Sequence, residues 1–206
     1  MSTNPTVFVV DDDQAMRTSL QWLIESTGMQ VKTFESADAF LSNFYPERAG
    51  CLLLDVRMPG MSGLELQSYL AREGYQLPVI IITGHGDVGM AVKAMRAGAM
   101  DFIEKPFHDE DLLRSIQRAL EVDQRQRLSR AARADILARV ADLTPREHEV
   151  MGMVTDGKAN REIAVALGVT PKTVEAHRAR VMEKMRAESL AELVRMVLIA
   201  GREEGG

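Results

Sequence analysis

The chain has 206 residues, of which 46% are apolar and 27% are charged, and its formal net charge at pH 7 is -5. This length allows one or two globular domains with substantial hydrophobic cores. The sequence contains no run of about 18 apolar residues, so we expect no membrane-spanning helix. Its first residues lack the basic and apolar regions of a secretion signal. Cys51 is the single cysteine, which excludes an intrachain disulfide and, with the other features, predicts a cytoplasmic protein.

The charge is distributed unevenly along the chain. Residues 1–120 carry 16 acidic and 10 basic side chains, whereas residues 121–141 carry 3 acidic and 5 basic ones. Residues 142–206 are nearly balanced, but within them residues 158–186 have 7 basic and 3 acidic side chains. A local basic stripe in an acidic protein is typical of a small nucleic-acid contact. A solvated helical face is the alternative, and charge counts alone favour it.

Strand and helix patterns alternate five times before about residue 120. The strands are expected near residues 6–10, 30–34, 51–54, 78–83 and 100–104. Apolar residues at helical spacing separate them, and a fifth helix begins near Asp109. Strict alternation predicts an α/β domain with a five-stranded parallel sheet that helices cover on both faces.

Charged side chains follow three of these expected strands. Asp11, Asp12 and Asp13 follow the first strand, Asp55 follows the third, and Lys105 follows the fifth. The apolar runs are short and rich in branched or aromatic residues, so we interpret each as a buried strand. Functional groups of parallel sheets collect beyond the carboxyl ends of the strands, so these side chains should meet in one crevice. Crowded carboxylates need a cation, and Mg2+ prefers oxygen ligands.

Residues 121–141 are rich in Ala, Arg, Gln and Glu, and predict a helical linker that continues the fifth helix. Leu128, Ala132, Ile136 and Val140 recur every four residues as a narrow apolar stripe. The first half of the linker has few apolar anchors, so a break near Ser129 remains an alternative.

Residues 142–206 predict an all-helical domain. Thr144-Pro145 and Thr170-Pro171 each supply an N-cap followed by a proline at the first helical position. A short helix over about 160–167, a turn at Gly168 and a helix that ends near Met185 form a helix-turn-helix pattern, in which the second helix usually enters the major groove of DNA. Ser189 is expected to cap a fourth helix, which ends near residue 200.

Several motifs together resemble a known family. They are Val9-Val10-Asp11-Asp12-Asp13, Leu54-Asp55-Val56-Arg57-Met58-Pro59-Gly60, Phe102-Ile103-Glu104-Lys105-Pro106, Leu143-Thr144-Pro145-Arg146-Glu147 and Thr173-Val174-Glu175-Ala176-His177-Arg178. Residues 5–120 resemble the receiver domain of bacterial two-component response regulators. Residues 142–202 resemble the LuxR-type, or NarL/FixJ-type, DNA-binding domain, and Gly84-His85-Gly86-Asp87 favours the FixJ branch. The resemblance implies a 1–120 receiver, a 121–141 linker and a 142–206 helix-turn-helix domain.

The resemblance also implies roles in phosphoryl transfer. Asp55 would accept a phosphoryl group from a sensor histidine kinase, and Lys105 and Thr83 would bind its oxygens. Mg2+, or Mn2+ as a substitute, would be held by Asp11, Asp12, Asp55 and the carbonyl of Arg57, with Asp13 outside the ligand set. Phe102 would move between exposed and buried positions. Read alone, each of these residues also fits a turn, a cap or a core position, and their joint occurrence in the right order favours function.

In the DNA-binding half, Glu175, Ala176 and Ala179 lie where family members contact base edges. Relatives often carry Lys at the position of Glu175 or of Ala179, so a borrowed operator sequence would not transfer. The candidates for phosphate contacts, each with a solvated side chain as its alternative, are Lys158, Asn160, Lys172, Thr173, His177, Arg178, Arg180 and Lys184. His177 also fits a cap or a hydrogen bond in the core.

The resemblance predicts a transcription regulator that dimerises when phosphorylated, binds double-stranded promoter DNA and acts on RNA polymerase. Its receiver could instead block the recognition helix as a monomer. We do not expect an enzyme beyond transfer to, and slow hydrolysis from, its own aspartate. Phosphohydrolases of the haloacid dehalogenase type carry a second Asp two residues after the nucleophile, where this chain has Arg57. A protein-interaction module in place of the DNA-binding output is a further alternative, which does not need the basic balance of residues 158–186.

Overall fold

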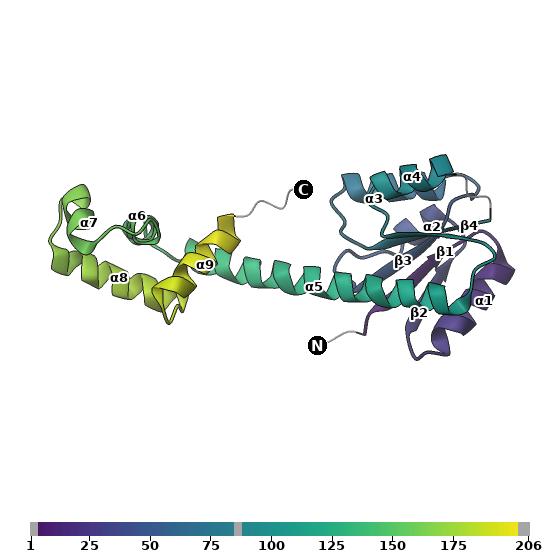
Figure 1. Cartoon of the computed structure of the whole chain (residues 1–206), viewed down its shortest axis with the longest axis horizontal. Coiled ribbons are helices and arrows are strands. Elements are labelled where there is room, and N and C mark those ends of the chain that lie inside the picture. Colours follow the sequence, from purple (N-terminus) through teal and green to yellow (C-terminus); the bar gives the residue numbers. More distant parts are fainter. Residues whose placement is uncertain (1–3, 85–87, 202–206) are drawn as a thin grey trace. The chain divides into compact units, whose positions relative to one another are not determined.

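The computed structural model describes residues 4–84 and 88–201. Its N-terminal part contains a five-stranded sheet with the order β2-β1-β3-β4-β5, in which all neighbouring strands are parallel (Figure 1). The strands are β1 Thr6–Val10, β2 Gln30–Phe34, β3 Gly50–Asp55, β4 Val79–Thr83 and β5 Asp101–Glu104. Each strand predicted from the sequence is confirmed within one residue at either end. The central strand is β3, which ends at Asp55.

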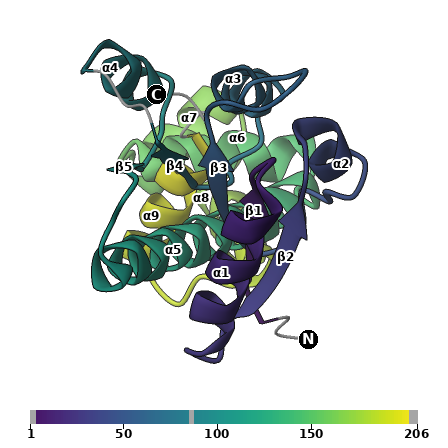
Figure 2. The same ribbon diagram turned by 90° about the vertical axis from the view of Figure 1, so that its right-hand side faces the viewer.

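Helices cover both faces of the sheet, as the alternation predicted (Figure 2). These helices are α1 Gln14–Glu25, α2 Ala37–Leu41, α3 Gly63–Arg72, α4 Val88–Arg96 and α5 Asp109–Ala141. Helices α2, α3 and α4 pack against Phe8, Leu52 and Leu54, while α1 and the first turns of α5 pack against Val7 and Leu53. Successive side chains of a strand point to opposite faces, so each central strand contributes to both cores.

The interpretation of β5 as a buried strand, made from its sequence, is wrong. Asp101, Phe102 and Ile103 are only partly buried and Glu104 is exposed, whereas every residue of β1, β3 and β4 is buried. The cause is its place at the edge of the sheet, beside β4 alone. An apolar run of four residues does not distinguish a central strand from an edge strand.

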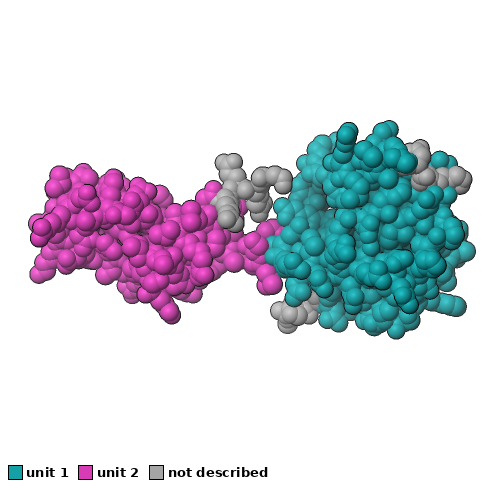
Figure 3. All heavy atoms as spheres, viewed as in Figure 1, with its two compact units in different colours: residues 1–127 teal, residues 128–206 magenta. Residues whose placement is uncertain are grey.

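Helix α5 runs without interruption from Asp109 to Ala141, so the break considered near Ser129 is not present. The chain divides into two compact units, residues 1–127 and 128–206, and the dividing point lies within this helix (Figure 3). Each unit has its own hydrophobic core. The two units are described separately below.

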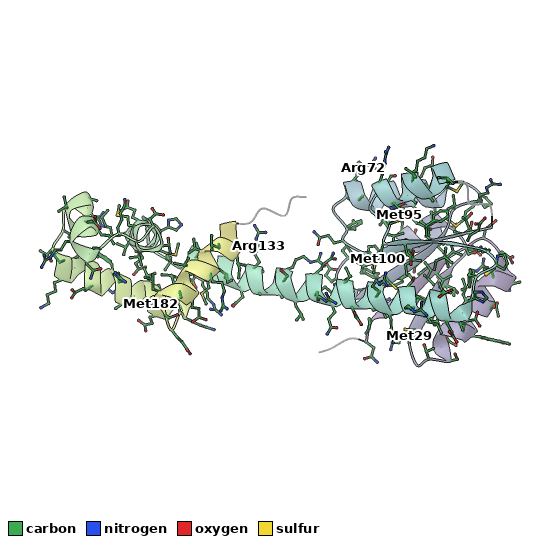
Figure 4. All side chains as sticks on the ribbon, viewed as in Figure 1. Met29, Arg72, Met95, Met100, Arg133 and Met182 are labelled. Carbon is green, nitrogen blue, oxygen red and sulfur yellow. The ribbon has the colours of Figure 1, made fainter. Side chains whose placement is uncertain are left out.

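The second unit is helical. Besides the last turns of α5 it contains α6 Pro145–Thr155, α7 Asn160–Leu167, α8 Pro171–Met185 and α9 Leu190–Gly201. Ile136 of α5 is buried in this core, and the Arg139 guanidinium donates to the carbonyl of Met185 at 3.0 Å. Arg133 donates to the carbonyl of Ala200 near the end of α9 (Figure 4). The last two turns of α5 therefore belong to the core of the second unit, an attachment that the apolar stripe alone did not specify.

The predicted helix caps of this unit are confirmed. Thr144 and Glu147 form a capping box, and the Thr170 hydroxyl accepts from the Thr173 amide at 3.2 Å. Gly168 ends α7 with a φ of 64°, a conformation that glycine adopts without strain. The Ser189 hydroxyl accepts from the Glu192 amide at the start of α9. Across the described ranges, no helix combines the length and apolar character needed to cross a bilayer.

Candidate functional site

The acidic side chains and the lysine singled out in the sequence meet at the carboxyl edge of the sheet. Asp11 follows β1, Asp55 is the last residue of β3, and Lys105 follows β5. The Lys105 Nζ donates to Asp11 Oδ2 and to Asp55 Oδ1, each at 2.8 Å. Both carboxylates are almost fully buried, with 3% and 8% of their side-chain surfaces exposed. One ammonium is thus shared between two buried carboxylates.

The backbone fixes the remaining oxygens of these carboxylates. Asp11 Oδ1 accepts from the amide of Asp13 at 2.9 Å, and Asp55 Oδ2 accepts from the amide of Arg57 at 2.7 Å. The Lys105 amide donates to the carbonyl of Thr83 at 2.8 Å, which continues the pairing of β5 with β4 past its last residue. The Lys105–Pro106 peptide is cis. These bonds hold the reactive groups in place through the backbone of four segments.

Burial and charge shift the pKa values of the two partners in the same direction. Burial raises the pKa of Asp55 above its ordinary value, the bond to Lys105 and its charge pull it partly back, and the nearby Asp11 raises it further. Burial lowers the pKa of Lys105, but its bonds to Asp11 and Asp55 outweigh this and raise it. Lys105 is therefore a firmly protonated ammonium, while the two carboxylates still carry an excess of negative charge.

The β1–α1 loop places the other two aspartates differently. Asp12 is exposed, whereas the Asp13 carboxylate accepts from the Ala15 amide at 2.8 Å and caps α1. Asp13 thus has a structural role, in keeping with its expected place outside the ligand set. Sequence reasoning missed Arg17, whose Nη1 donates to the main-chain carbonyl of Asp11 at 2.7 Å. Its position six residues after Asp11, on the first turns of α1, was the available signal.

Thr83 lies on β4, the strand next to the acceptor strand, and Phe102 lies on β5, which pairs with β4. Thr83 ends β4 and is 1% exposed, while Phe102 on β5 is partly exposed and packs against the core under α2, α3 and α4. The neighbouring residues 85–87, which contain His85 and Asp87 of the FixJ-type motif, lie outside the described residues.

The first residue of α3 packs directly against the acceptor strand. The Gly63 amide donates to the carbonyl of Val56 at 3.0 Å. A Cβ atom at Gly63 would lie 2.1 Å from the carbonyl oxygen of Asp55, so a side chain does not fit. Glycine at this position allows α3 to begin immediately beside the acceptor.

Oxygen donors dominate the crevice, but they do not form a closed metal cage. Within residues 4–84 and 88–201, no three His, Cys, Asp or Glu side chains are gathered as a ligand set. Asp11 and Asp55 face the same cation, Lys105, and Asp12 stands exposed on the loop beside them. Of the side chains predicted to hold a divalent cation, Asp11 and Asp55 thus lie together at Lys105, and Asp12 lies on the adjoining loop.

The second candidate site is the exposed face of α8. Lys172, Glu175, Ala176, Ala179 and Arg180 are all exposed and recur at helical spacing along this helix. The opposite face, with Val174 and Val181, is buried in the core. The stripe thus offers both side chains expected to contact bases and side chains expected to contact phosphates. Lys158, just before α7, is also exposed.

The remaining five candidates of this half are partly buried, and four of them are engaged within the domain. Arg178 donates to Asn160 Oδ1 at 2.6 Å, which joins α8 to the start of α7. The Lys184 Nζ donates to Glu147 Oε2 at 2.7 Å and to the carbonyl of Asp142 at 3.1 Å. The fourth, Thr173, serves the cap of α8 described above. Their internal bonds leave fewer donors for DNA than the sequence suggested.

His177 is the last of the predicted contacts. It is partly buried on α8, and its Nδ1 has no hydrogen-bond partner among the residues that the structure describes. The predicted alternative of a hydrogen bond in the core is therefore not seen for this nitrogen.

Two families match the two parts of the chain. "Response regulator receiver domain" matches residues 7–117, and "Bacterial regulatory proteins, luxR family" matches residues 141–197. The chain belongs to the FixJ-like response regulators. The resemblance drawn from its motifs is confirmed, together with the fold class that it implied.

Relatives of similar length agree with this assignment. This response regulator is 48% identical to the transcriptional regulatory protein FixJ of Azorhizobium caulinodans, over 95% of its own chain and 92% of the relative. It is 48% identical to FixJ of Rhizobium meliloti, over 97% and 98% of the two chains. Among solved structures, the response regulator StyR matches with a TM-score of 0.87 at 43% identity, over 95% and 99% of the two chains. Full-length FixJ from B. japonicum matches with a TM-score of 0.59 at 45% identity, over 97% and 98%.

Proposed function

We propose that Asp55 accepts a phosphoryl group from a sensor histidine kinase, and that this step switches promoter binding by the second unit. The observation that carries the proposal is the pairing of a nearly buried Asp55, at the end of the central strand, with Lys105 at 2.8 Å. One oxygen of this buried carboxylate accepts from a lysine and the other accepts from a backbone amide. The carboxylate is therefore held in one orientation for reaction.

The transfer itself needs few protein groups. An oxygen of Asp55 attacks the phosphorus, the bond from phosphorus to the donor histidine nitrogen breaks, and the electron pair of that bond stays on the imidazole. Lys105, already a firmly held ammonium, would move from Asp55 to a phosphoryl oxygen and stabilise the negative charge there. The Thr83 hydroxyl, at the end of the neighbouring strand, would donate to another phosphoryl oxygen.

The donor chemistry of the crevice fits a hard divalent cation, which we propose to be Mg2+, with Mn2+ as a substitute. Two buried carboxylates share one ammonium, so the crevice retains negative charge that a cation would offset. Asp11, Asp12, Asp55 and the carbonyl of Arg57 would hold the ion. Mg2+ bound there supplies positive charge for the phosphoryl oxygens.

For the DNA-binding half, we propose that the exposed stripe of α8 enters the major groove. Glu175, Ala176 and Ala179 would contact bases, while Lys172 and Arg180 would contact phosphates, in company with Lys158 before α7. The other proposed phosphate contacts, which have fewer free donors than the exposed residues, are Asn160, Thr173, His177, Arg178 and Lys184. We keep the functional division into a receiver of residues 1–120, a linker of 121–141 and a DNA-binding domain of 142–206.

We further propose that phosphorylation promotes a homodimer through α4 and β5. Val88, Val92 and Met95 form an exposed apolar stripe on α4, with 82%, 43% and 48% of their surfaces exposed. Phe102, next to this face, would change its position as Thr83 turns to the phosphoryl group. The dimer would activate transcription through RNA polymerase in the cytoplasm. Turnover on a small substrate is not proposed, because Arg57 stands where a phosphohydrolase needs a second acid.

Labelling by radioactive acetyl phosphate or a sensor kinase tests the acceptor. Asp55→Asn should abolish the label, because an amide is a poor nucleophile, while Asp38→Asn on α2 should label like the wild type. Asp12→Ala should lose labelling together with its dependence on Mg2+. Full labelling of Asp55→Asn would place the acceptor at another residue and end the proposal.

A further inference from the structure

Several hydrogen bonds hold the β1–α1 loop, residues 11–13. The Asp11 amide donates to the carbonyl of Phe34 at 3.2 Å, and the Asp13 amide donates to Asp11 Oδ1 at 2.9 Å. The Ala15 amide donates to Asp13 Oδ1 at 2.8 Å. These three bonds fix the entry to the loop, its turn and the start of α1. The carbonyl group of Asp11 also accepts a hydrogen bond, in this case from a side chain.

That side chain is Arg17. Its Nη1 donates to the carbonyl of Asp11 at 2.7 Å, from a partly buried position on α1. The carbonyl of Asp11 and the amide of Asp12 belong to one planar peptide group, so fixing one end fixes the plane that leads into Asp12. Arg17 thus sets the direction in which the chain presents Asp12, while Lys105 holds the side chain of Asp11 at 2.8 Å.

We infer that Arg17 is a positioning residue for the divalent-cation site, which orients the β1–α1 loop so that Asp11 and Asp12 can bind the ion together. The inference rests on the proposed function, because it assumes that this loop binds a cation. It goes beyond that function in naming a residue that contacts neither the phosphoryl group nor the ion.

Electrostatics alone would give Arg17 the opposite effect. A guanidinium beside the acidic cluster repels a second cation, so removing its charge should tighten cation binding if charge were its only contribution. Removing its hydrogen bond should weaken binding if the loop depends on it, since residues that support metal ligands typically contribute about 10- to 100-fold in affinity. The sign of the change therefore distinguishes the two roles.

The experiment measures the dissociation constant of Mn2+ for the full chain by electron paramagnetic resonance. Arg17→Met removes both the charge and the donor and should weaken Mn2+ binding by about tenfold. Arg17→Lys keeps a cation that can donate one hydrogen bond and should fall between the wild type and Arg17→Met. Arg118→Met is the matched control, because it removes the same charge from an exposed position on α5 and should bind Mn2+ like the wild type.

Folding and the proposed function are controlled separately. Arg17→Gln, which is polar and neutral, replaces Arg17→Met if the latter shows a lower thermal midpoint without metal, and a smaller weakening is then expected because Gln keeps an amide donor. If Arg17→Met, or Arg17→Gln in its place, binds Mn2+ as tightly as the wild type or more tightly, the positioning role is overturned. The proposed function is then left intact. If Asp12→Ala binds Mn2+ with the wild-type affinity, the loop does not form the proposed cation site, and this inference fails with it.

Discussion

At the scale of single residues, the crevice illustrates how a protein keeps a carboxylate reactive. Asp55 loses solvent on burial, which raises its pKa, and Lys105 compensates only in part because it is shared with Asp11. A second cation or a phosphoryl group would each change this balance. On the proposed function, the same residues would couple binding of an ion to acceptance of a phosphoryl group.

The exposed stripe of α8 allows the residues proposed to contact bases to be distinguished from those proposed to contact phosphates. Glu175→Ala should relax base preference at one operator position by about 1–3 kcal/mol. Arg180→Ala should weaken binding to all sequences alike and lower the slope of binding against salt by about one. Fluorescence anisotropy with matched and mismatched operators, at several salt concentrations, measures both effects.

Lys184→Ala is a poor choice for this comparison, because the variant also removes the partner of Glu147 at 2.7 Å. If Glu175→Ala and Arg180→Ala behave alike on matched and mismatched sites, the division into base contacts and phosphate contacts is wrong. A loss of binding that salt does not modulate would exclude Arg180 from phosphate contact.

Residues that carry charge after a strand could be predicted from the sequence, because their place in the chain fixes their place at the sheet edge. Asp11, Asp55 and Lys105 were found in this way. Arg17 was not, since it binds a backbone carbonyl, and a pattern of side chains does not reveal which carbonyls need a donor. The internal bonds of Arg178 and Lys184 were also not visible, because they depend on contacts between helices.

At the scale of elements, α5 is fastened to the first unit beyond residue 120. Asp123 is 1% exposed, and its carboxylate accepts from the Gly50 amide at 2.9 Å and from Arg127 Nε at 2.8 and 2.9 Å. The Arg127 guanidinium also donates to the carbonyl of Glu47 at 2.8 Å and to that of Arg48. The bonds from Asp123 and Arg127 to residues 47–50 join positions 73 or more residues apart, so the sequence pattern, which predicted a linker here, did not reveal them.

Removing Arg127 should destabilise the first unit. Arg127→Ala leaves the buried Asp123 without its cation and should lower the free energy of unfolding by about 3 kcal/mol. Arg125→Ala is the control on the same helix, because its pair with Glu121 is exposed, and it should cost less than about 1 kcal/mol. Urea unfolding followed by the methyl resonances of Leu52 and Ile80, which are buried in the first unit, reports this unit. Equal effects of the two variants would show that the Asp123–Arg127 contacts do not anchor the helix.

The second unit contains an ion pair with a defined dependence on pH. The hydrogen bond from Lys184, followed by that from the Thr144 amide, lowers the pKa of Glu147 from 4.5 to about 2. Because the folded-state pKa is lower than the unfolded one, the stabilisation is fully present above pH 4.5 and is lost as the pH falls toward 2. Glu147→Gln should therefore be less stable than the wild type at neutral pH, and the difference should shrink in acid.

Thermal unfolding of the second unit, followed by the methyl resonances of Val150 and Leu193 in the buried core, measures this dependence. Glu149→Gln is the control, since Glu149 is an exposed carboxylate on the same helix. A difference between Glu147→Gln and the wild type that stays constant from neutral pH to pH 3 would contradict the linkage.

At the scale of the whole molecule, the two units have separate cores and separate candidate sites, and α5 contributes to both cores. The first unit presents the crevice around Asp55, and the second presents the exposed stripe of α8. If phosphorylation of Asp55 controls DNA binding by α8, as proposed, a two-state element has to connect the two units. The sequence motifs indicated both candidate sites, and the family resemblance implied the movement of Phe102, since a pattern of residues does not by itself show a conformational change.

We predict that the connecting element is a dimer formed through α4 and β5. Phosphorylation of Asp55 would turn Thr83 toward the phosphoryl group, Phe102 would fill the space, and the exposed stripe of Val88, Val92 and Met95 would become a contact between two copies. The wild type should sediment as a dimer with beryllofluoride and Mg2+ and as a monomer without them. Asp55→Asn should remain monomeric in both conditions.

Val92→Asp separates this mechanism from simple unblocking of the recognition helix. The substitution places a charge in the proposed contact, on the exposed face of α4. The variant should therefore still be labelled at Asp55, while it remains monomeric and fails to gain affinity for a two-site operator. Lys93→Asp, a change of charge on the same helix that leaves the apolar stripe intact, is the control for nonspecific electrostatic effects. A Val92→Asp protein that stays monomeric when labelled, yet gains as much DNA affinity as the wild type, would exclude the dimer and favour release of a blocked recognition helix.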